Sequence, residues 1–452
     1  MQPVVTILGG VIGGMFGQPK VGLTVGALAA GWLFPPAAED NRGEVAGLSV
    51  TVPQKGQVLP VIYGKTRVTG TVIWYGNFEK HETDEGGGSG GGKGGGTVIT
   101  YSAGFAIALG EGRMGTLSAM WANGDPVALG GIAYSFYPGL PGAAPDPYIA
   151  AHLGVGQQNL AYRHICYIVL QAYSLGYSTA MPNFTFEVTR TTADLVAGNA
   201  DLTTLGLNVF VGDANGDLNP VVCLADFLTH DRYGLGLSAA DVDAPSWVEQ
   251  ATYCATHALY ASPIMDSAGS GLNHIEHLLS YFDGILIYSE GVFKLRTRRS
   301  PAREMLDYTV IDWRDWLEGA APRLSRGDDR TMPNTIAVEY RARTNAYNQG
   351  VVERSDDWDV GLRGQYRQQI SLPGVTTAAM ADKVAAKLLW SRVVPPFSVE
   401  LGIGPQGAWY EPGDLIGIKG SEFYALENAK LRIVAIREES NRSYTITAVE
   451  ER

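Results

Sequence analysis

The spacing of hydrophobic positions changes three times along this chain and divides it into four regions. Residues 1–38 are almost continuously apolar, and residues 39–190 carry short runs of β-branched and aromatic residues separated by turn residues. Helical spacing marks residues 191–304, and residues 305–452 return to strand-like runs. The pattern predicts a mainly β chain with an α+β middle, preceded by an apolar, glycine-rich helical segment.

The first β-rich region is predicted to form a closed or nearly closed antiparallel sheet. Phe184, Phe186 and Val188 alternate with polar residues, as in a strand that is wet on one face. The pair Asn123-Gly124 separates two strand-like runs and is a strong signal for a tight hairpin. The expected strands are Leu59–Tyr63, Thr66–Tyr75, Val98–Leu109, Ser118–Ala122, Pro126–Leu129, Tyr162–Gln171 and Phe184–Arg190.

A glycine-rich tract, residues 81–97, interrupts this region. Nine of the eleven residues from Gly86 to Gly96 are glycine, so the tract has almost no apolar area with which to offset its chain entropy. We therefore expect a mobile loop. A phosphate-binding loop would need a helix directly after the glycines, and the strand-like run Thr97–Tyr101 follows instead.

Two motifs could bind a cofactor or a metal, but each lacks the flanking sequence or spacing that such a site requires. Gly110, Gly112 and Gly115 match a dinucleotide-binding spacing, but the sequence beyond them predicts a hairpin where that fold needs a helix. In the stretch His274–His277 the two histidines lie three residues apart, without the HExxH spacing of a zinc protease. We therefore predict no cofactor and no metal site.

The stretch Ala225–Leu237, ADFLTHDRYGLGL, and the residues just before it carry the clearest helix start and end signals of the middle region. Asn219 and Pro220 predict the start of a helix ahead of it, with asparagine as the cap and proline in the first turn. Either Gly234 or Gly236 is expected to end this helix, because glycine accepts the left-handed conformation of a helix exit.

Two more helices and a hairpin complete the predicted middle region. Ser246 and Glu249 have the spacing of a capping box at the start of the second helix. A third helix is expected from Leu272 to Phe282, and a hairpin with its turn at Ser289–Gly291 follows it.

The last region predicts a second sheet, interrupted by one helix at Thr377–Arg392. Asp356, Asp357 and Asp359 form an acidic group, but adjacent residues of a strand point to opposite faces, so no catalytic acid pair follows. We interpret the group as a solvated turn. The expected strands are Thr335–Arg343, Gln365–Ile370, Phe397–Ile403, Asp414–Ile418, Lys430–Glu438 and Ser443–Val449.

Charge and cysteine content narrow the classes of function. The net charge of -12 argues against a surface that binds nucleic acid tightly, because phosphate binding needs clusters of lysine and arginine. It is compatible with a surface that nucleic acid slides past. Cys166, Cys223 and Cys254 form neither a disulfide framework nor a zinc spacing, so we expect buried thiols of a protein made in a reducing cytoplasm.

The apolar segment holds two runs, Pro3–Gly17 and Val21–Phe34, each shorter than the roughly 20 residues that span a bilayer. No signal peptide is predicted, because no basic stretch precedes the first run. Glycines spaced by four let helix backbones approach closely. The simplest interpretation of this segment is a packed helical hairpin or a loosely ordered tail. The glycine spacing also favours self-association or contact with a partner's apolar helix, and transient membrane contact is a further alternative. The glycines are Gly9, Gly13, Gly17, Gly22 and Gly26.

Several segments, in a consistent order, resemble those of the tail-tip hub proteins of long-tailed phages and gene transfer agents. The similarity extends to the hub region of the lambda-type tail-tip protein and to the central hub of contractile tails. The segments are LPVIYGKTRVTGTVIWYG (Leu59–Gly76), TYSAGFAIALGEG (Thr100–Gly112), MWANGDPV (Met120–Val127), ADFLTHDRYGLGL (Ala225–Leu237) and EPGDLIGI (Glu411–Ile418).

The resemblance implies two tail-tube-like antiparallel β-barrel domains, one on each side of the α+β middle, in a homotrimer. Three chains would then contribute six barrels, which match the sixfold symmetry of the tail tube. It implies a structural virion protein at the tail tip or baseplate, with a channel through which viral DNA passes without specific binding. The implied partners are the distal tail protein, other tail-tip proteins and the tape-measure protein, the last of which would contact the glycine-spaced segment. No catalytic residue is implied.

Two alternatives stay open from the sequence. The chain could be a tail-associated cell-wall-degrading enzyme, if residues distant in sequence converge into a catalytic set. It could also be a peripheral tip protein that inserts residues 1–34 into a membrane.

Overall fold

The apolar segment is almost entirely outside the part of the chain that the computed structural model describes. Val5–Thr6 form a two-residue strand, β1, where the sequence predicted a helix. Gly9, Gly13, Gly17, Gly22 and Gly26 are not among the described residues, so their predicted helix and contacts stay predictions. The described residues are 5–6, 58–84, 97–154, 156–298, 309–317, 322–326, 332–392, 397–419 and 430–451.

The first β-rich region forms two sheets that pack on a shared core. One sheet has the order β11-β2-β5-β9-β8, with β4 paired to β5, and the other has the order β3-β10-β6-β7. Strand β11 (Ile264–Met265) of the former sheet comes from the middle region and pairs with β2. Phe184, Phe186 and Val188 are buried in this core, as their alternation with polar residues predicted. The described strands form two sheets instead of one closed ring, so the predicted barrel is not confirmed.

The elements of the first region follow one another closely along the chain. They are β2 (Val61–Ile62), β3 (Gly64–Thr69), β4 (Thr71–Asp84), β5 (Thr97–Glu111), β6 (Thr116–Ala122), β7 (Asp125–Val127), η1 (Leu129–Gly131), β8 (Tyr134–Pro138), α3 (Pro147–Ala151), β9 (Ile165–Gly176) and β10 (Phe184–Arg190). The expected hairpin at Asn123-Gly124 is confirmed, because both residues have left-handed φ angles of 54° and 94° between β6 and β7.

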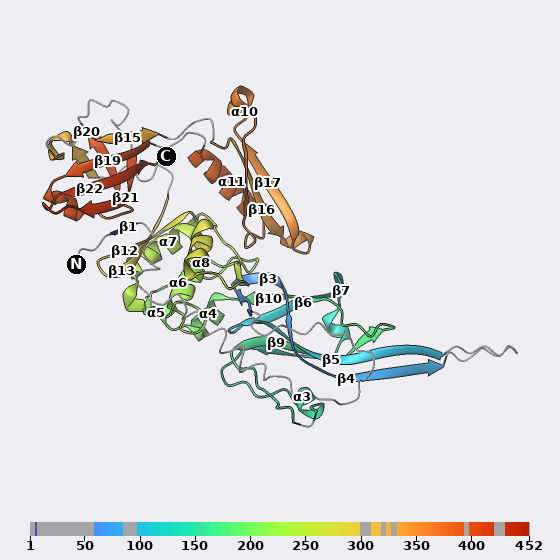
Figure 1. Cartoon of the computed structure of the whole chain (residues 1–452). Helices are drawn as coiled ribbons and strands as arrows, with labels where there is room; N and C mark the ends of the chain where they lie inside the picture. The colour runs from blue at the N-terminus through green and yellow to red at the C-terminus, as the bar shows by residue number, and fades with distance from the viewer. Residues whose placement is uncertain are drawn as a thin grey trace.

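Strands β4 and β5 form a long ribbon that extends away from the rest of the molecule (Figure 1). Asp84 pairs with Thr97 at the end of the ribbon. Residues 81–84 are therefore strand and not loop, because ladder hydrogen bonds satisfy their backbone even where the side chains are exposed. The predicted mobile loop is thereby reduced to residues 85–96, which lie outside the described residues.

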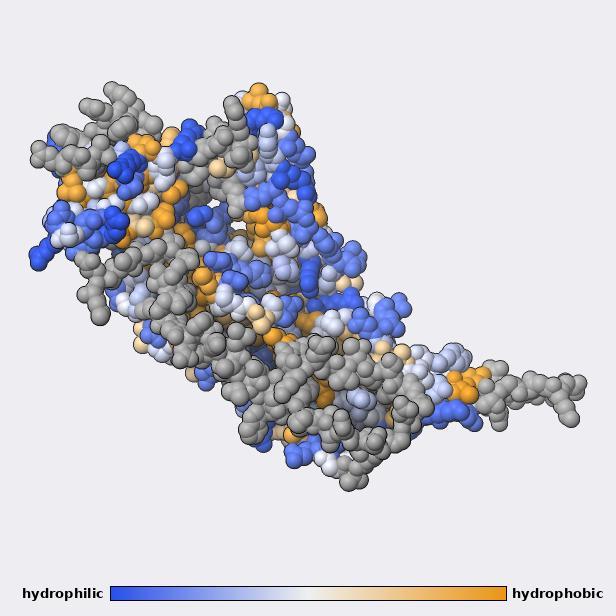
Figure 2. Space-filling view, in the orientation of Figure 1, coloured by the Kyte–Doolittle hydropathy of each residue, from blue (hydrophilic) through white to orange (hydrophobic). Residues whose placement is uncertain are grey.

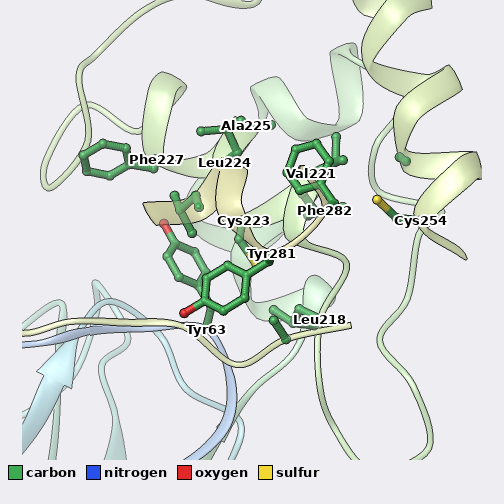
Figure 3. Packing of buried hydrophobic residues seen from close by; sticks show 14 of the residues in the cluster. Tyr63, Leu218, Val221, Cys223, Leu224, Ala225, Phe227, Cys254, Tyr281 and Phe282 are labelled. Atoms are coloured by element: carbon green, nitrogen blue, oxygen red, sulfur yellow. The ribbon is translucent and has the colours of Figure 1, made fainter. Parts of the chain in front are cut away.

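Helix α6 (Pro220–Thr229) is the buried centre of the middle region, and each of its residues is buried. Asn219 caps it by accepting a hydrogen bond from the backbone N–H of Val221, and Pro220 lies in the first turn, as predicted. Figure 3 shows side chains of α6 packed together with Tyr63, Tyr281 and other residues from distant elements.

The predicted end of this helix at Gly234 or Gly236 is wrong. The helix ends at Thr229, and the chain then folds back along it. The backbone N–H of Leu235 donates to the carbonyl of Phe227, so tertiary hydrogen bonds replace the expected helical ones in this stretch.

The cap of the second helix of the middle region lies three residues earlier than the predicted cap, Ser246. Helix α7 (Ala244–Thr256) is capped by Asp243, whose side chain accepts a hydrogen bond from the backbone N–H of Ser246. Ser246 donates its hydroxyl hydrogen bond to the carbonyl of Asp243 and therefore lies within the first turn. With Asp243 as the cap, Pro245 lies in the first turn, where proline is favourable, so this cap prevails over the predicted one.

The remaining elements of the middle region pack around α6. The predicted third helix and hairpin are both present, and the hairpin turn contains Glu290 and Gly291 with left-handed φ angles of 53° and 86°. The elements are α4 (Thr192–Gly198), α5 (Asp201–Thr204), η2 (Ala239–Asp241), β11 (Ile264–Met265), α8 (Gly271–Ser280), β12 (Gly284–Ser289) and β13 (Val292–Thr297).

Residues 332–392, which we name the blade, form a three-stranded sheet of order β17-β16-β18 with a helix, α11, against it. Ile336 and Val338 of β16 and Ala381 of α11 belong to the same buried cluster as α6. The blade therefore packs on the middle region. Its elements are β16 (Thr335–Ala342), η5 (Arg343–Asn345), β17 (Asn348–Ser355), α10 (Asp357–Arg363), β18 (Arg367–Ser371) and α11 (Ala378–Arg392).

The other strands of the last region form a separate sheet with the order β14-β20-β21-β22-β19-β15, and β1 pairs with β21. Its core contains Val399, Ile416 and Ile446 and is distinct from the cluster around α6. The elements are β14 (Thr309–Asp312), η3 (Trp313–Asp315), β15 (Arg323–Arg326), β19 (Phe397–Ile403), η6 (Pro405–Trp409), β20 (Leu415–Lys419), β21 (Lys430–Glu438) and β22 (Tyr444–Glu450).

Residues 305–452 therefore contain two sheets with separate cores among the described strands, and not the single barrel that the resemblance implied. The reason is that the apolar positions of β16 pack towards α6, whereas those of β19 to β22 pack on one another. The predicted pair of flanking barrels is not confirmed. The domain boundaries after residues 38, 190 and 304 stay predictions.

Candidate functional site

Asp226, in the middle of α6, is the centre of a buried polar network, which we name the Asp226 network. Tyr63 and Tyr233 donate hydrogen bonds to its Oδ2 at 3.1 and 2.6 Å, and Asn199 Nδ2 donates to its Oδ1 at 3.1 Å. Tyr63 follows β2 and Asn199 follows α4. One carboxylate thus joins the first β-rich region to two segments of the middle region.

Arg190, the last residue of β10, supplies the positive charge of this network and is 1% exposed. Its Nη2 donates to Tyr233 Oη at 2.6 Å, and its guanidinium carbon lies 5.1 Å from the centre of the Tyr233 ring. Burial alone would lower the pKa of Arg190, but the nearby Tyr233 and Asp226 outweigh burial and raise it. Arg190 therefore stays charged inside the core.

The tyrosines of the network keep their protons at neutral pH. Burial raises the pKa of both Tyr63 and Tyr233 well above the usual value, and the charge of Asp226 adds to the effect. Each hydroxyl therefore remains a hydrogen-bond donor to the carboxylate. This chemistry holds segments together, because removing one partner of a buried charged group leaves that group uncompensated, which is costly.

The RYG residues of the stretch Ala225–Leu237 are Arg232, Tyr233 and Gly234, and each has a structural role. Arg232 forms an ion pair with Glu111 at the end of β5, and Tyr233 belongs to the Asp226 network. A Cβ atom on Gly234 would lie 2.3 Å from the carbonyl oxygen of Phe227, so only glycine fits there.

Asp217 is the centre of a second buried contact, the Asp217 junction, which joins the blade to the middle region. Its carboxylate accepts hydrogen bonds from Ser262 Oγ at 2.5 Å, Thr376 Oγ1 at 2.7 Å and Arg343 Nη2 at 2.5 Å. Arg343 Nη2 also donates to the carbonyl of Lys65 in β3 at 3.1 Å. One arginine at the base of the blade thus contacts both neighbouring regions.

Glu187 extends this junction onto β10 of the first region. Tyr347 donates to Glu187 Oε2 at 2.8 Å, Ser118 donates to Oε1 at 2.5 Å, and Lys65 Nζ lies 3.0 Å from Oε1. Burial raises the pKa of Glu187, but these three partners outweigh burial and lower it. Ala346 and Tyr347 have left-handed φ angles of 49° and 63°, a strained conformation that the surrounding contacts must hold.

The free end of the blade carries an exposed apolar pair. Trp358 and Leu362 on α10 are 75% and 64% exposed. The interpretation of Asp356, Asp357 and Asp359 as a solvated turn is wrong, because they begin this helix: the Asp356 side chain accepts from the backbone N–H of Asp359 at 3.1 Å. Aspartate is favoured at a helix N-cap and first turn, which explains the difference.

The histidines that were weighed as a metal site lie on α8 and contact aromatic rings. His277 Nε2 is 2.9 Å from Tyr281 Oη, and His274 meets the ring of Phe227 edge to face. Across the described ranges, no three histidine, cysteine, aspartate or glutamate side chains are grouped so as to hold a metal ion.

Gly110 of the glycine motif lies in β5, whereas Gly112 and Gly115 lie in the turn between β5 and β6, where Gly112 has a φ angle of 85°. A strand begins at Thr116, in the position where a dinucleotide fold would need a helix. Cys166, Cys223 and Cys254 are buried free thiols, as predicted. In the portion of the chain that is described, every helix is too short or too polar to cross a membrane.

Comparison with known proteins gives one match by sequence and several by structure. Residues 270–436, from α8 into β21, match a family model described as a putative phage tail protein. A search of curated proteins finds no match. Among solved structures, a chain in the virion of a native gene transfer agent particle superposes with a TM-score of 0.63 and 20% identity, over 98% of this chain and 95% of that one.

Two tail proteins are also similar in part. The 43 kDa tail protein of prophage MuSo2 from Shewanella oneidensis gives a TM-score of 0.30 and 13% identity, over 86% of this chain and 98% of that one. A tail protein from Neisseria meningitidis MC58 gives 0.34 and 8%, over 86% and 97%. The chain thus has the overall fold of the gene transfer agent chain, and its residues 270–436 match the phage tail family model.

Proposed function

We propose that this chain is a structural virion protein that forms the hub of a tail tip or baseplate and joins the tail tube to the tip. The observation that supports the proposal most is the fold shared over 98% of the chain with a chain of the gene transfer agent virion. The match of residues 270–436 to a phage tail family model supports it independently.

A homotrimer around a DNA channel is part of the proposal. A ring subunit must hold its parts at fixed angles, and the Asp226 network and the Asp217 junction fix the first region, the middle region and the blade to one another. A net charge of -12 suits a wall that DNA passes, because tight phosphate binding would stall its exit.

The proposed partners are the distal tail protein, other tail-tip proteins and the tape-measure protein. The apolar segment with Gly9, Gly13, Gly17, Gly22 and Gly26 is the proposed contact for self-association or for the tape-measure protein. The chain is made in the host cytoplasm and then resides at the tail tip of the virion. Transient contact of this segment with a host membrane is a second proposal, and liposome flotation with and without residues 1–34 tests it.

We propose no enzymatic role. The competing function is a tail-associated cell-wall-degrading enzyme, which needs acids that face a substrate. Asp217 and Asp226 are instead buried and engaged by hydrogen-bond donors from the protein. Clearing on a muralytic zymogram that is lost in an Asp357→Ala variant would replace the structural proposal with the enzymatic one.

The location of the protein tests the hub proposal. Particles that carry an affinity tag on the last residue, Arg452, are labelled with gold and imaged beside untagged particles. We expect gold at the far end of the tail in tagged particles only. Gold along the tube or on the head would overturn the proposal.

A further inference from the structure

We propose that α10 of one copy docks into an apolar groove between α8 and α11 of a neighbouring copy, with Trp358 as the anchor. This contact rests on the proposed homotrimer and supplies one of its interfaces. The donor surface, residues Asp356–Tyr366, is named the tip. The acceptor surface, named the groove, is lined by residues of α8, β12 and α11.

The tip exposes apolar side chains at the free end of the blade, where Figure 2 shows a small orange area beside blue residues. Trp358 and Leu362 are four residues apart on α10 and therefore lie on the same side of the helix. Tyr366, which follows the helix, is also exposed. A single exposed apolar residue is ordinary, but three so close together mark an interaction surface.

Hydrogen bonds within the tip and to Asn334 of the blade hold the tip in place. Arg363 Nε donates to Asp359 Oδ1 at 2.7 Å within the helix. The buried side chain of Asn334 donates to the carbonyl of Gly364 and accepts from the backbone N–H of Tyr366, both at 2.8 Å. A surface that is fixed before binding loses little conformational entropy on binding, so this rigidity favours association.

The groove consists of two adjoining hollows of about 250 and 180 Å³ that share Ser280 and Asp283. Leu272 and Leu279 line the larger hollow, and Leu388 lines the smaller one. An apolar cavity of about 150 Å³ is enough to bind benzene. Either hollow is therefore large enough to take part of an indole ring.

Opposite net charges surround the two surfaces. The tip carries three aspartates against one arginine, whereas the groove carries Arg298, Lys383 and Lys387 against Glu276 and Asp283. The tip is thus net negative and the groove net positive. Such charge complementarity speeds the encounter of the two copies and fixes their relative orientation. The Trp358 side chain, once buried in the groove, supplies most of the affinity.

The tip of the same copy is too far away to fill the groove, so the tip that complements its charge is assigned to a second copy. In Figure 1, α10 lies at the outer end of the blade, whereas α8 lies beside α6 in the middle of the chain. Because tip and groove are different surfaces, their contact is head-to-tail, and such contacts close into rings when the rotation permits. This is the geometry that a homotrimer requires.

Mass measurement of the purified full-length chain tests the docking directly. We expect Trp358→Ala to weaken trimer formation at least tenfold in concentration. The matched control is Trp409→Ala, because Trp409 is 86% exposed on η6, outside both surfaces, and its loss should leave the trimer unchanged. A cooperative thermal transition in both variants would show that each one folds, even if loss of association lowers the melting temperature of Trp358→Ala.

Disulfide crosslinking gives the geometric test. A Leu362→Cys, Ser280→Cys variant should form crosslinks between chains under mild oxidation, whereas Leu362→Cys with Tyr177→Cys should not. The three native cysteines are buried and should not interfere. A Trp358→Ala chain that stays trimeric without crosslinks in the first pair overturns the docking and leaves the trimer standing. A wild-type chain that stays monomeric overturns both.

Discussion

Tyr233 donates a 2.6 Å hydrogen bond to Asp226, seven residues earlier in the chain, and so closes the stretch after α6 onto that helix. The same hydroxyl accepts a hydrogen bond from Arg190 Nη2 at 2.6 Å. One oxygen atom therefore links the buried cation of the first β-rich region to the buried carboxylate of the middle region.

Removal of this hydroxyl should loosen the contact between the two regions. We expect Tyr233→Phe to lower the free energy of unfolding by about 1–3 kcal/mol, since Arg190 loses a partner in the core. Asp226→Ala should cost more, about 3–5 kcal/mol, because it leaves a buried charge uncompensated. Urea unfolding measures both, and Tyr177→Phe is the control, because Tyr177 is 78% exposed. A Tyr233→Phe protein as stable as this control would contradict the role of the network.

The junction at Glu187 should make stability depend on pH. The pKa of Glu187 is lowered in the folded protein, so its contribution is present above the unfolded pKa of about 4.5 and is lost as the pH falls through the folded pKa. Glu187→Gln should therefore be less stable than wild type at pH 7, and the difference should shrink in more acidic buffers. Thermal melts across this range measure it.

The exposed Glu79 on the β4–β5 ribbon provides the control for this experiment. Glu79→Gln should follow the wild-type melting temperature at each pH. A gap between wild type and Glu187→Gln that stays constant with pH would mean that the carboxylate charge does not stabilise the junction.

Local features of the fold could be predicted from the sequence where a residue acts on its own neighbours. Asn219 and Pro220 set the start of α6, and Asn123-Gly124 set a hairpin, because capping and turn chemistry are local. The separation of the blade from the last sheet could not be predicted. Strands β16 and β19 read alike, and which core each one joins depends on contacts far away in sequence.

The polar contacts of the site were missed for the same reason. Asp226 stands inside the apolar run VVCLADFL, which is a signal for a buried carboxylate with a partner. Its partners Tyr63, Arg190 and Asn199 lie far from it in the chain, so spacing alone could not identify them. The exposed face of α10 was missed because its aspartates were taken as a turn.

The pairing of Asp84 with Thr97 sets a limit on shortening the glycine tract. Deletion of Gly88–Gly95 leaves a four-residue connection, which is long enough for a hairpin, and loop closure changes by only about 1 kcal/mol. We expect a melting temperature close to that of wild type. Deletion of Gly86–Gly96 leaves only Glu85 and should unpair the end of the ribbon. A large loss of stability in the shorter deletion would show that the tract is ordered.

Close packing of the apolar segment is a separate prediction about assembly. Gly13→Leu and Gly26→Leu add bulk at the glycine-spaced positions, so we expect fewer complete tails or impaired DNA release while the chain still folds. Ala27→Leu is the control, because in the predicted helix residue 27 would lie about 100° around the axis from residue 26. Counts of tailed particles and infectious titre measure the effect. Normal particles from the double glycine variant would remove the idea.

The most direct test of the hub proposal is a cryo-electron microscopy reconstruction of purified tail tips. We predict three copies of this chain around a central channel, at the point where the tail tube meets the tail tip of the virion. A density for one copy, or copies that surround no channel, would contradict the proposal.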